Sequence, residues 1–193
     1  MRIVGIDPGS ERTGYGCVET EGRRLCLVTF GVIRVRPADA FPDRLARIHA
    51  ELADMLSRMR PTAVAVESIF HAVNARSALK LGHARGVAVL AAVQANCTVV
   101  EYTPAEVKRA VVGYGRAEKP QVQQMVKLLL GLDRVPSPHD AADALAVAIC
   151  HLHSVPTPSA AAPGSGYADP RLAEMMAAAK GQPKSWRQYR PPA

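Results

Sequence analysis

Short runs of hydrophobic residues separated by polar turns characterise the first 35 positions. Residues 2–6 form a β-branched run that ends at the turn sequence of residues 7–9. Apolar positions return over residues 15–20 and 25–35, and the polar residues between these runs are typical of a hairpin loop. This pattern predicts three strands joined as a meander.

Helical and strand-like segments then alternate along the chain. Residues 41–59 carry apolar side chains at helical spacing, and Pro61 ends the pattern. Strands interleaved with helices indicate a layered α/β domain. The remaining predicted elements are strands over residues 63–66 and 98–102 and helices over residues 74–94, 104–112, 119–130 and 139–151.

The composition changes near residue 154. Residues 154–166 are rich in Pro, Ser, Ala and Gly, which is typical of a linker, and basic residues outnumber acidic ones in the rest of the tail. We therefore expect a folded domain over residues 1–153 and a linker with a basic tail over residues 154–193, mostly disordered when free. A short helix is expected over residues 171–180.

The formal net charge of +7 makes an anionic partner plausible but does not choose between nucleic acid, an acidic protein and a charged membrane surface. The four cysteines form no CxxC pair, which argues against a zinc ribbon. No signal-peptide pattern and no apolar run of membrane-spanning length occurs in the sequence. We therefore expect a reduced, cytoplasmic protein with free thiols.

Four carboxylates occupy positions from which they could meet. Asp7 follows the first strand, Glu67 follows the strand over residues 63–66, and Asp140 and Asp143 share one face of the last helix. A cluster of carboxylates is costly unless a divalent cation neutralises it, and oxygen ligands suit Mg²⁺ or Mn²⁺. Two such ions about 4 Å apart would support phosphodiester hydrolysis.

Each carboxylate alone also has an ordinary interpretation. Asp7 could be a turn residue, Asp140 a helix N-cap, and Glu67 a member of a surface ion pair. Asp143 is harder to explain in this way, because the helix around it is mostly apolar. Only the combination of the four favours a catalytic site.

The segment over residues 5–16 is rich in glycine and follows a strand. It contains neither the Gly-Lys-Ser/Thr sequence of a Walker A loop nor a GxGxxG dinucleotide motif. The segment does suit an aspartate presented at a strand end, with glycines that let the backbone approach a phosphate.

Ordered sequence matches over residues 1 to about 153 resemble the RuvC family of bacterial Holliday-junction resolvases. Many matches in one order are more specific than any single motif. The matching segments are GIDPGS (5–10), TGYG (13–16), VESIF (66–70), residues 74–88, VK (107–108), VVG (111–113), AEK (117–119), QVQ (121–123) and DAADALA (140–146).

The resemblance implies an RNase H-like fold, with a five-stranded mixed sheet flanked by helices. It implies a homodimer that makes paired symmetric nicks in four-way DNA junctions during recombination and repair, leaving 5′-phosphate and 3′-hydroxyl ends. It also implies two Mg²⁺ ions per active site, with Mn²⁺ as the alternative, one activating water and one stabilising the departing 3′ oxygen. The branch-migration complex of RuvA and RuvB is the implied partner.

By motif position, the family's four acidic catalytic residues, which hold the metals, correspond to Asp7, Glu67, Asp140 and Asp143. Some relatives use a histidine among the metal ligands of the last helix. We expect Asp140 to be the ligand here. The adjacent His139 is either a supporting group or proton carrier, or an ordinary residue at a helix N-terminus.

The resemblance also suggests DNA contacts. Lys108 and Lys119 match family lysines near the DNA backbone, where a lysine offsets transition-state charge. Phe70 matches an aromatic residue that stacks on an unpaired base, with a core position as the alternative. Arg76 and Lys80 are interpreted as phosphate contacts or as charges at a dimer rim.

Gly82 and Gly86 would allow close helix approach, either at a dimer interface or within one subunit.

Three other functions fit parts of the sequence. An RNase H-like nuclease that processes RNA would share the Asp7 strand, but not the match over residues 70–89. A nucleotide-binding protein of the actin or sugar-kinase type needs two such domains, which 193 residues do not provide. A junction-binding protein that does not cut would be expected to lack a carboxylate. We therefore favour the junction resolvase.

Overall fold

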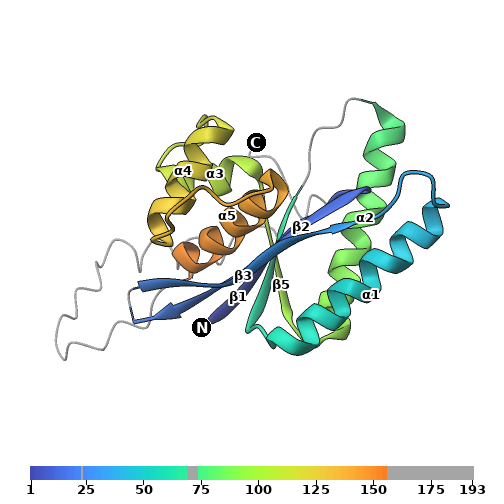
Figure 1. Ribbon diagram of the computed structural model, residues 1–193, viewed down its shortest axis with the longest axis horizontal. Helices are drawn as coiled ribbons and strands as arrows, with labels where there is room; N and C mark the ends of the chain where they lie inside the picture. Colours follow the sequence, from blue (N-terminus) through green and yellow to red (C-terminus); the bar gives the residue numbers. More distant parts are fainter. Residues whose placement is uncertain (23, 69–73, 156–193) are drawn as a thin grey trace, which may run out of the picture. The chain divides into compact units, whose positions relative to one another are not determined.

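The computed structural model describes residues 1–22, 24–68 and 74–155 (Figure 1). Several predictions lie outside the described residues: the base-stacking role of Phe70, nearly all of the linker and basic tail, and the helix over residues 171–180. Within the described residues, no helix combines the length and the apolar character needed to cross a membrane.

A five-stranded mixed sheet forms the centre of the structure, in the order β3-β2-β1-β4-β5. β1, β2 and β3 form the predicted antiparallel meander, and β4 and β5 run parallel to β1. The predicted five-stranded mixed sheet is therefore confirmed. The strands are β1 (Arg2–Asp7), β2 (Arg12–Glu21), β3 (Arg24–Arg34), β4 (Ala63–Glu67) and β5 (Thr98–Tyr102).

β2 begins earlier than the sequence predicts. Apolar residues indicated a strand from residue 15, but pairing with β3 already starts at Arg12, opposite Arg34. The hydroxyl of Thr13 donates a hydrogen bond to the carbonyl of Gly9 at 3.0 Å, which closes the turn after β1. Backbone pairing holds this polar start of the strand, so hydrophobic periodicity does not reveal it.

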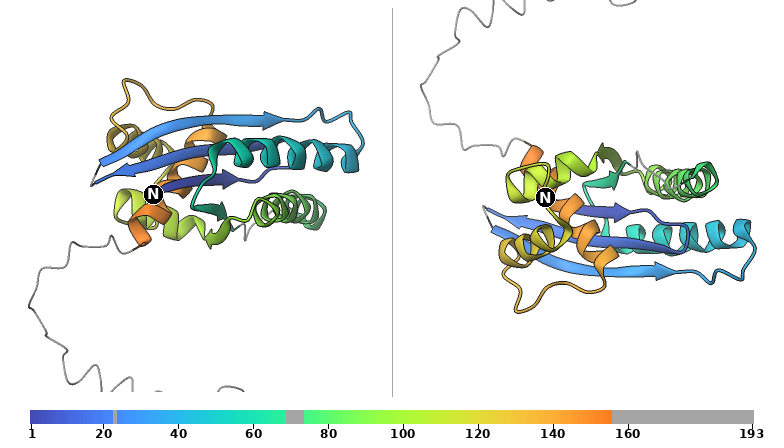
Figure 2. Two further views of the ribbon diagram at one scale, coloured as in Figure 1. Left: turned by 90° about the horizontal axis from the view of Figure 1, so that it is seen from below. Right: turned by 90° about the horizontal axis from the view of Figure 1, so that it is seen from above.

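Two helical layers cover the sheet (Figures 1 and 2). α1 and α2 lie on one face, and α3, α4 and α5 lie on the other. α5 extends past its predicted end at residue 151, and Leu152 in its last turn is buried. The helices are α1 (Phe41–Met59), α2 (Ala75–Gln94), α3 (Pro104–Val112), α4 (Lys119–Leu129) and α5 (His139–Ser154).

α5 packs directly on β1 and β2 because glycines face it. A Cβ atom on Gly5 would lie 2.0 Å from the carbonyl oxygen of Ala144, and one on Gly14 would lie 2.0 Å from that of Asp140. A Cβ atom on Gly16 would lie 2.7 Å from Leu145. These three glycines therefore admit a helix rather than a phosphate, contrary to the sequence-based expectation. The close approach sets the position of the carboxylates at the start of α5.

Candidate active site

Two neighbouring parallel strands place the first pair of carboxylates. β1 and β4 are paired, with Ile6 opposite Val66, so Asp7 and Glu67 follow at the same carboxyl edge of the sheet. Ile6 and Val66 are fully buried, which fixes both strand ends. The edge of an α/β sheet where strands end is a common location for ligand sites.

α5 brings a third carboxylate to this edge. A pocket of about 270 Å³ opens there. Asp143 lines it, whereas Asp140, three residues earlier on α5, is half-buried and does not. The lining residues are Asp7, Glu67, Pro104, Val107, Lys108, Lys119, Val122, Asp143 and Ala146.

Two lysines enter the same pocket from separate helices. Lys119 begins α4, and its Nζ donates a hydrogen bond to Oδ2 of Asp143 at 3.1 Å. Lys108 belongs to α3, whose start is fixed by a capping box between Thr103 and Glu106. The structure therefore gathers three of the four predicted carboxylates and both predicted lysines.

The carboxylates of the pocket repel one another in a partly dry environment. Burial, followed by the charges of Glu67, Asp143 and Asp140, raises the pKa of Asp7 to about 8. Burial and the charge of Asp143 also raise the pKa of Glu67, although Lys119 opposes this shift. The negative charge of Asp143 raises the pKa of Lys119. Additional positive charge in the pocket would therefore stabilise the ionised carboxylates.

The donor set fits a hard divalent cation. Its ligand atoms are carboxylate oxygens, which Mg²⁺ and Mn²⁺ prefer, and their mutual repulsion is the kind that a cation relieves. Within the described residues, no three His, Cys, Asp or Glu side chains already stand in a metal-binding arrangement. Ligation of one cation by all three carboxylates would therefore require side-chain movement.

Comparison with known proteins identifies the family. The family model described as "Crossover junction endodeoxyribonuclease RuvC" matches residues 3–151. The chain belongs to the RuvC family. The RuvC of Syntrophotalea carbinolica is 59% identical over 153 residues, which are 79% of this chain and 94% of that protein. The RuvC of Geobacter sp. strain M21 is 56% identical over 154 residues, which are 80% of this chain and 93% of that protein.

A solved RuvC structure has the same architecture. RuvC of Thermus thermophilus in complex with Holliday junction substrate is 40% identical, with a TM-score of 0.76. The match covers 79% of this chain and 93% of that one. It confirms the predicted RNase H-like α/β fold and the family that the sequence motifs indicated.

Some predicted site residues of this RuvC-family chain lie away from the pocket. Arg76 and Lys80 belong to α2 and do not line it, and Nζ of Lys80 lies 6.0 Å from the centre of the Phe41 ring.

His139 is exposed, and its Nδ1 hydrogen-bonds with Nε2 of Gln123 at 2.8 Å. This contact links the start of α5 to α4, and His139 does not line the pocket.

The apolar wall of this pocket was not predicted. Val107, Val122 and Ala146 line it between the charged groups. A helical signal exists for two of them, because Ala146 is three residues beyond Asp143 and Val122 is three beyond Lys119. Such apolar surface excludes water and strengthens the electrostatic interactions among the charged groups.

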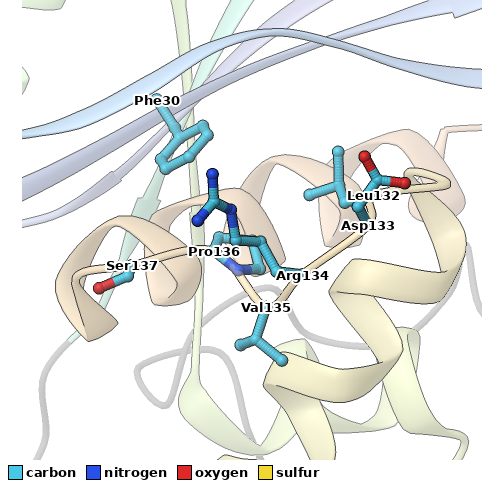
Figure 3. Close-up of a pocket in the computed structure, with 7 residues that line it drawn as sticks. All are labelled: Phe30, Leu132, Asp133, Arg134, Val135, Pro136 and Ser137. Carbon is cyan, nitrogen blue, oxygen red and sulfur yellow. The ribbon is translucent and has the colours of Figure 1, made fainter.

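A second pocket of about 470 Å³ lies between β3 and the segment that connects α4 to α5. Figure 3 shows Arg134 pointing toward Phe30 across this pocket. Asp133 is its one acidic lining residue, so it offers no carboxylate cluster. The acidic pocket at the ends of β1 and β4 is therefore the better candidate for chemistry. The remaining lining residues are Leu132, Val135, Pro136 and Ser137.

Proposed function

We propose that this chain is a metal-dependent endonuclease that resolves four-way DNA junctions during recombination and repair. It would make paired symmetric nicks that leave 5′-phosphate and 3′-hydroxyl ends. The observation that carries the proposal is the meeting of Asp7, Glu67 and Asp143 with two lysines in one pocket of a RuvC-family chain. The complex of a 40% identical relative with a Holliday junction supports the choice of substrate.

The carboxylates are assigned as the metal-binding groups. Asp7, Glu67 and Asp143 would hold Mg²⁺, or Mn²⁺ in its place, and Asp140 would join them from the same helix. Two bound ions would polarise the scissile phosphate and lower the pKa of the attacking water. We propose these four residues as the catalytic set.

The lysines serve the phosphate rather than the metal. The ammonium of Lys119 donates a hydrogen bond to Asp143 inside the pocket, so it stands where a substrate phosphate would meet the carboxylates. Lys108 approaches the pocket from α3. Both cations would then offset negative charge that grows on the phosphate in the transition state. The apolar wall would keep this charge pairing partly dry.

An unpartnered stripe on α2 supports a homodimer. Leu79, Gly82, Gly86, Leu90 and Val93 are exposed, and their spacing of three or four residues puts them on one helix face. Apart from α2 itself, a Cβ atom on either glycine would meet nothing within 4 Å among residues 1–22, 24–68 and 74–155, so packing among these residues does not explain the two glycines. We propose that a second copy covers this face. Two active sites related by a two-fold axis would suit a junction with near two-fold symmetry.

Further assignments remain predictions from the sequence. They are a nuclease domain over residues 1–153 with a separate tail over residues 154–193, base stacking by Phe70, and a role for Arg76 and Lys80 as phosphate contacts or as charges at a dimer rim. Cooperation with RuvA and RuvB belongs to the same group.

Cleavage of a synthetic mobile four-way junction tests the proposal. The full chain is incubated with Mg²⁺, with Mn²⁺ or with EDTA, and the nicks and end groups are mapped on each strand. We expect paired nicks at symmetric positions with either metal and none with EDTA. A plain duplex and a single-stranded RNA serve as controls. Preferred cutting of either control would refute the assigned substrate, and tight junction binding without nicks would favour the non-cutting binder.

A further inference from the structure

A pair of arginines stands at the start of β2 and the end of β3. Arg12 and Arg34 are directly opposite each other in the antiparallel register. Both side chains are exposed. Like charges at directly opposed positions of a sheet destabilise it, so this pair is unfavourable for the free protein.

The arginines lie on the α5 face of the sheet. Glu11 points to the other face, where its carboxylate lies 3.7 Å from the guanidinium of Arg44 on α1. Strand side chains alternate, so Arg12 shares a face with Gly14, which touches the backbone of Asp140. The cross-strand position of Arg34 gives it the same face.

Their location is the carboxyl edge of β1. Gly14 is opposite Asp7, so Arg12 lies two residues beyond the end of that strand. β2 and β3 are the first and second strands on one side of β1, whereas β4 with Glu67 lies on the other side. Arg34 is therefore about 10 Å to the side of β1, which equals the axial rise of about three phosphates of one DNA strand.

No acidic group neutralises the pair within residues 1–22, 24–68 and 74–155. Neither guanidinium forms an ion pair or a side-chain hydrogen bond there. Glu11 adjoins Arg12 in the sequence, but its carboxylate faces Arg44. Asp140 packs near Gly14, but it forms no ion pair with either arginine. The pair thus retains its full capacity to bind an anion.

We propose that Arg12 and Arg34 bind backbone phosphates of the DNA strand that enters the acidic pocket. The proposal rests on the proposed function and adds a second cationic flank to it. Lys108 and Lys119 approach the pocket from α3 and α4, and the arginine pair lies on the β2–β3 side of β1. The strand would be held on both sides of Asp7, which fixes the phosphate to be cut.

The test compares junction binding by the full chain and by the double variant Arg12→Gln/Arg34→Gln. Binding is measured by fluorescence anisotropy in EDTA over a range of salt concentrations. Each lost phosphate contact should lower the salt slope by about 1, so we expect a decrease of about 2 in its magnitude. At 0.1 M salt the affinity should fall on the order of ten- to a hundredfold. The double variant Arg12→Lys/Arg34→Lys should retain most of the slope.

Thermal melting of the free protein separates binding from folding. Removal of opposed like charges should leave the melting temperature of the glutamine variant unchanged or higher. The matched control is Arg24→Gln/Arg60→Gln, which also removes two exposed arginines. Arg24 begins β3, at the opposite end of the strand from Arg34, and Arg60 directly follows α1. We expect its salt slope to equal that of the unaltered chain.

An unchanged slope in the Arg12→Gln/Arg34→Gln variant would overturn the inference, as would an equal decrease in the control. A lower melting temperature in both the glutamine and the lysine variants would also overturn it, since the arginines would then serve folding. Failure of the proposed function looks different. In that case the unaltered chain would not cut the junction in Mg²⁺, whatever the salt slopes are.

Discussion

At the scale of single residues, burial and repulsion between carboxylates act strongly on Asp7. It ends a buried strand, and its neighbours Glu67 and Asp143 are carboxylates, so burial and repulsion raise its pKa to about 8. A residue that only closed a turn would face water instead. This cost is acceptable in a site that a cation neutralises when it works.

The raised pKa predicts that the metal-free protein loses stability as the pH rises. An unfolded aspartate titrates near 4, so the folded state binds more protons than the unfolded state between pH 4 and 8. The free energy of unfolding should therefore fall across this window. In EDTA, the melting temperature should drop from pH 5 to pH 8, and Asp7→Asn should flatten the drop.

Magnesium should reverse this loss. Mg²⁺ binds the ionised carboxylates of the folded state, so its stabilising effect should grow toward pH 8. The Asp7→Asn variant should gain little from Mg²⁺. A melting temperature that rises steadily with pH in EDTA would contradict the charge arrangement described for Asp7.

At the scale of elements, the site depends on how closely α5 approaches the sheet. Gly5, Gly14 and Gly16 form a surface without side chains, and the backbone of α5 and the side chain of Leu145 lie against it. Protein interiors are packed too densely to absorb an added methyl group at such contacts. Displacement of α5 would move Asp143 relative to Asp7 and Glu67.

A Gly14→Ala substitution should therefore reduce both stability and cleavage. The new methyl group would lie 2.0 Å from the backbone oxygen of Asp140, and overpacking of this kind costs about 1–3 kcal/mol. Urea unfolding and the junction-cleavage rate measure the two effects. Gly115→Ala is the control, because its Cβ atom would have an ordinary contact at 3.4 Å. Full stability in the Gly14 variant would mean that α5 is not held this closely.

At the scale of the whole molecule, the proposed paired cleavage would require two copies of the chain. The exposed apolar stripe on α2 is the surface that we assign to the second copy. Leu79 in this stripe is 65% exposed, and Leu128 on α4 is 68% exposed. Replacing either leucine should therefore cost the monomer little buried apolar contact. They form a matched pair for testing the assignment.

Leu79→Lys should shift the chain from dimer to monomer, whereas Leu128→Lys should not. Sedimentation velocity measures the assembly, and circular dichroism verifies the fold. The monomeric variant should lose coordinated nicking of opposite strands, because one subunit carries one site. Equal sedimentation of the two variants would place the dimer contact elsewhere.

The strands and the carboxylates at their ends could be predicted from the sequence. Asp7 and Glu67 were predictable because hydrophobic runs mark buried strands, and parallel strands end at one edge. Lys119 needed the family resemblance, since its contact with Asp143 joins helices distant in sequence.

Other features depended on pairing that local patterns do not encode. The opposed position of Arg12 and Arg34 arises from the strand register, and polar residues at a strand end give no hydrophobic signal. Gly14 suggested close approach, but only the structure identified α5 as the approaching group. Asp140 was expected beside Asp143, yet it lies outside the pocket lining.

The most direct test is the rate of junction nicking by four single variants in saturating Mg²⁺. Asp7→Asn, Glu67→Gln and Asp143→Asn each remove a charge from the pocket, and Asp133→Asn removes an exposed one elsewhere. Loss of groups that merely support metal ligands costs about 10–100-fold, so each pocket variant should lose at least that much. The Asp133 variant should cut like the unaltered chain. Near-normal cutting by any of the three pocket variants would contradict the assignment of this pocket as the active site.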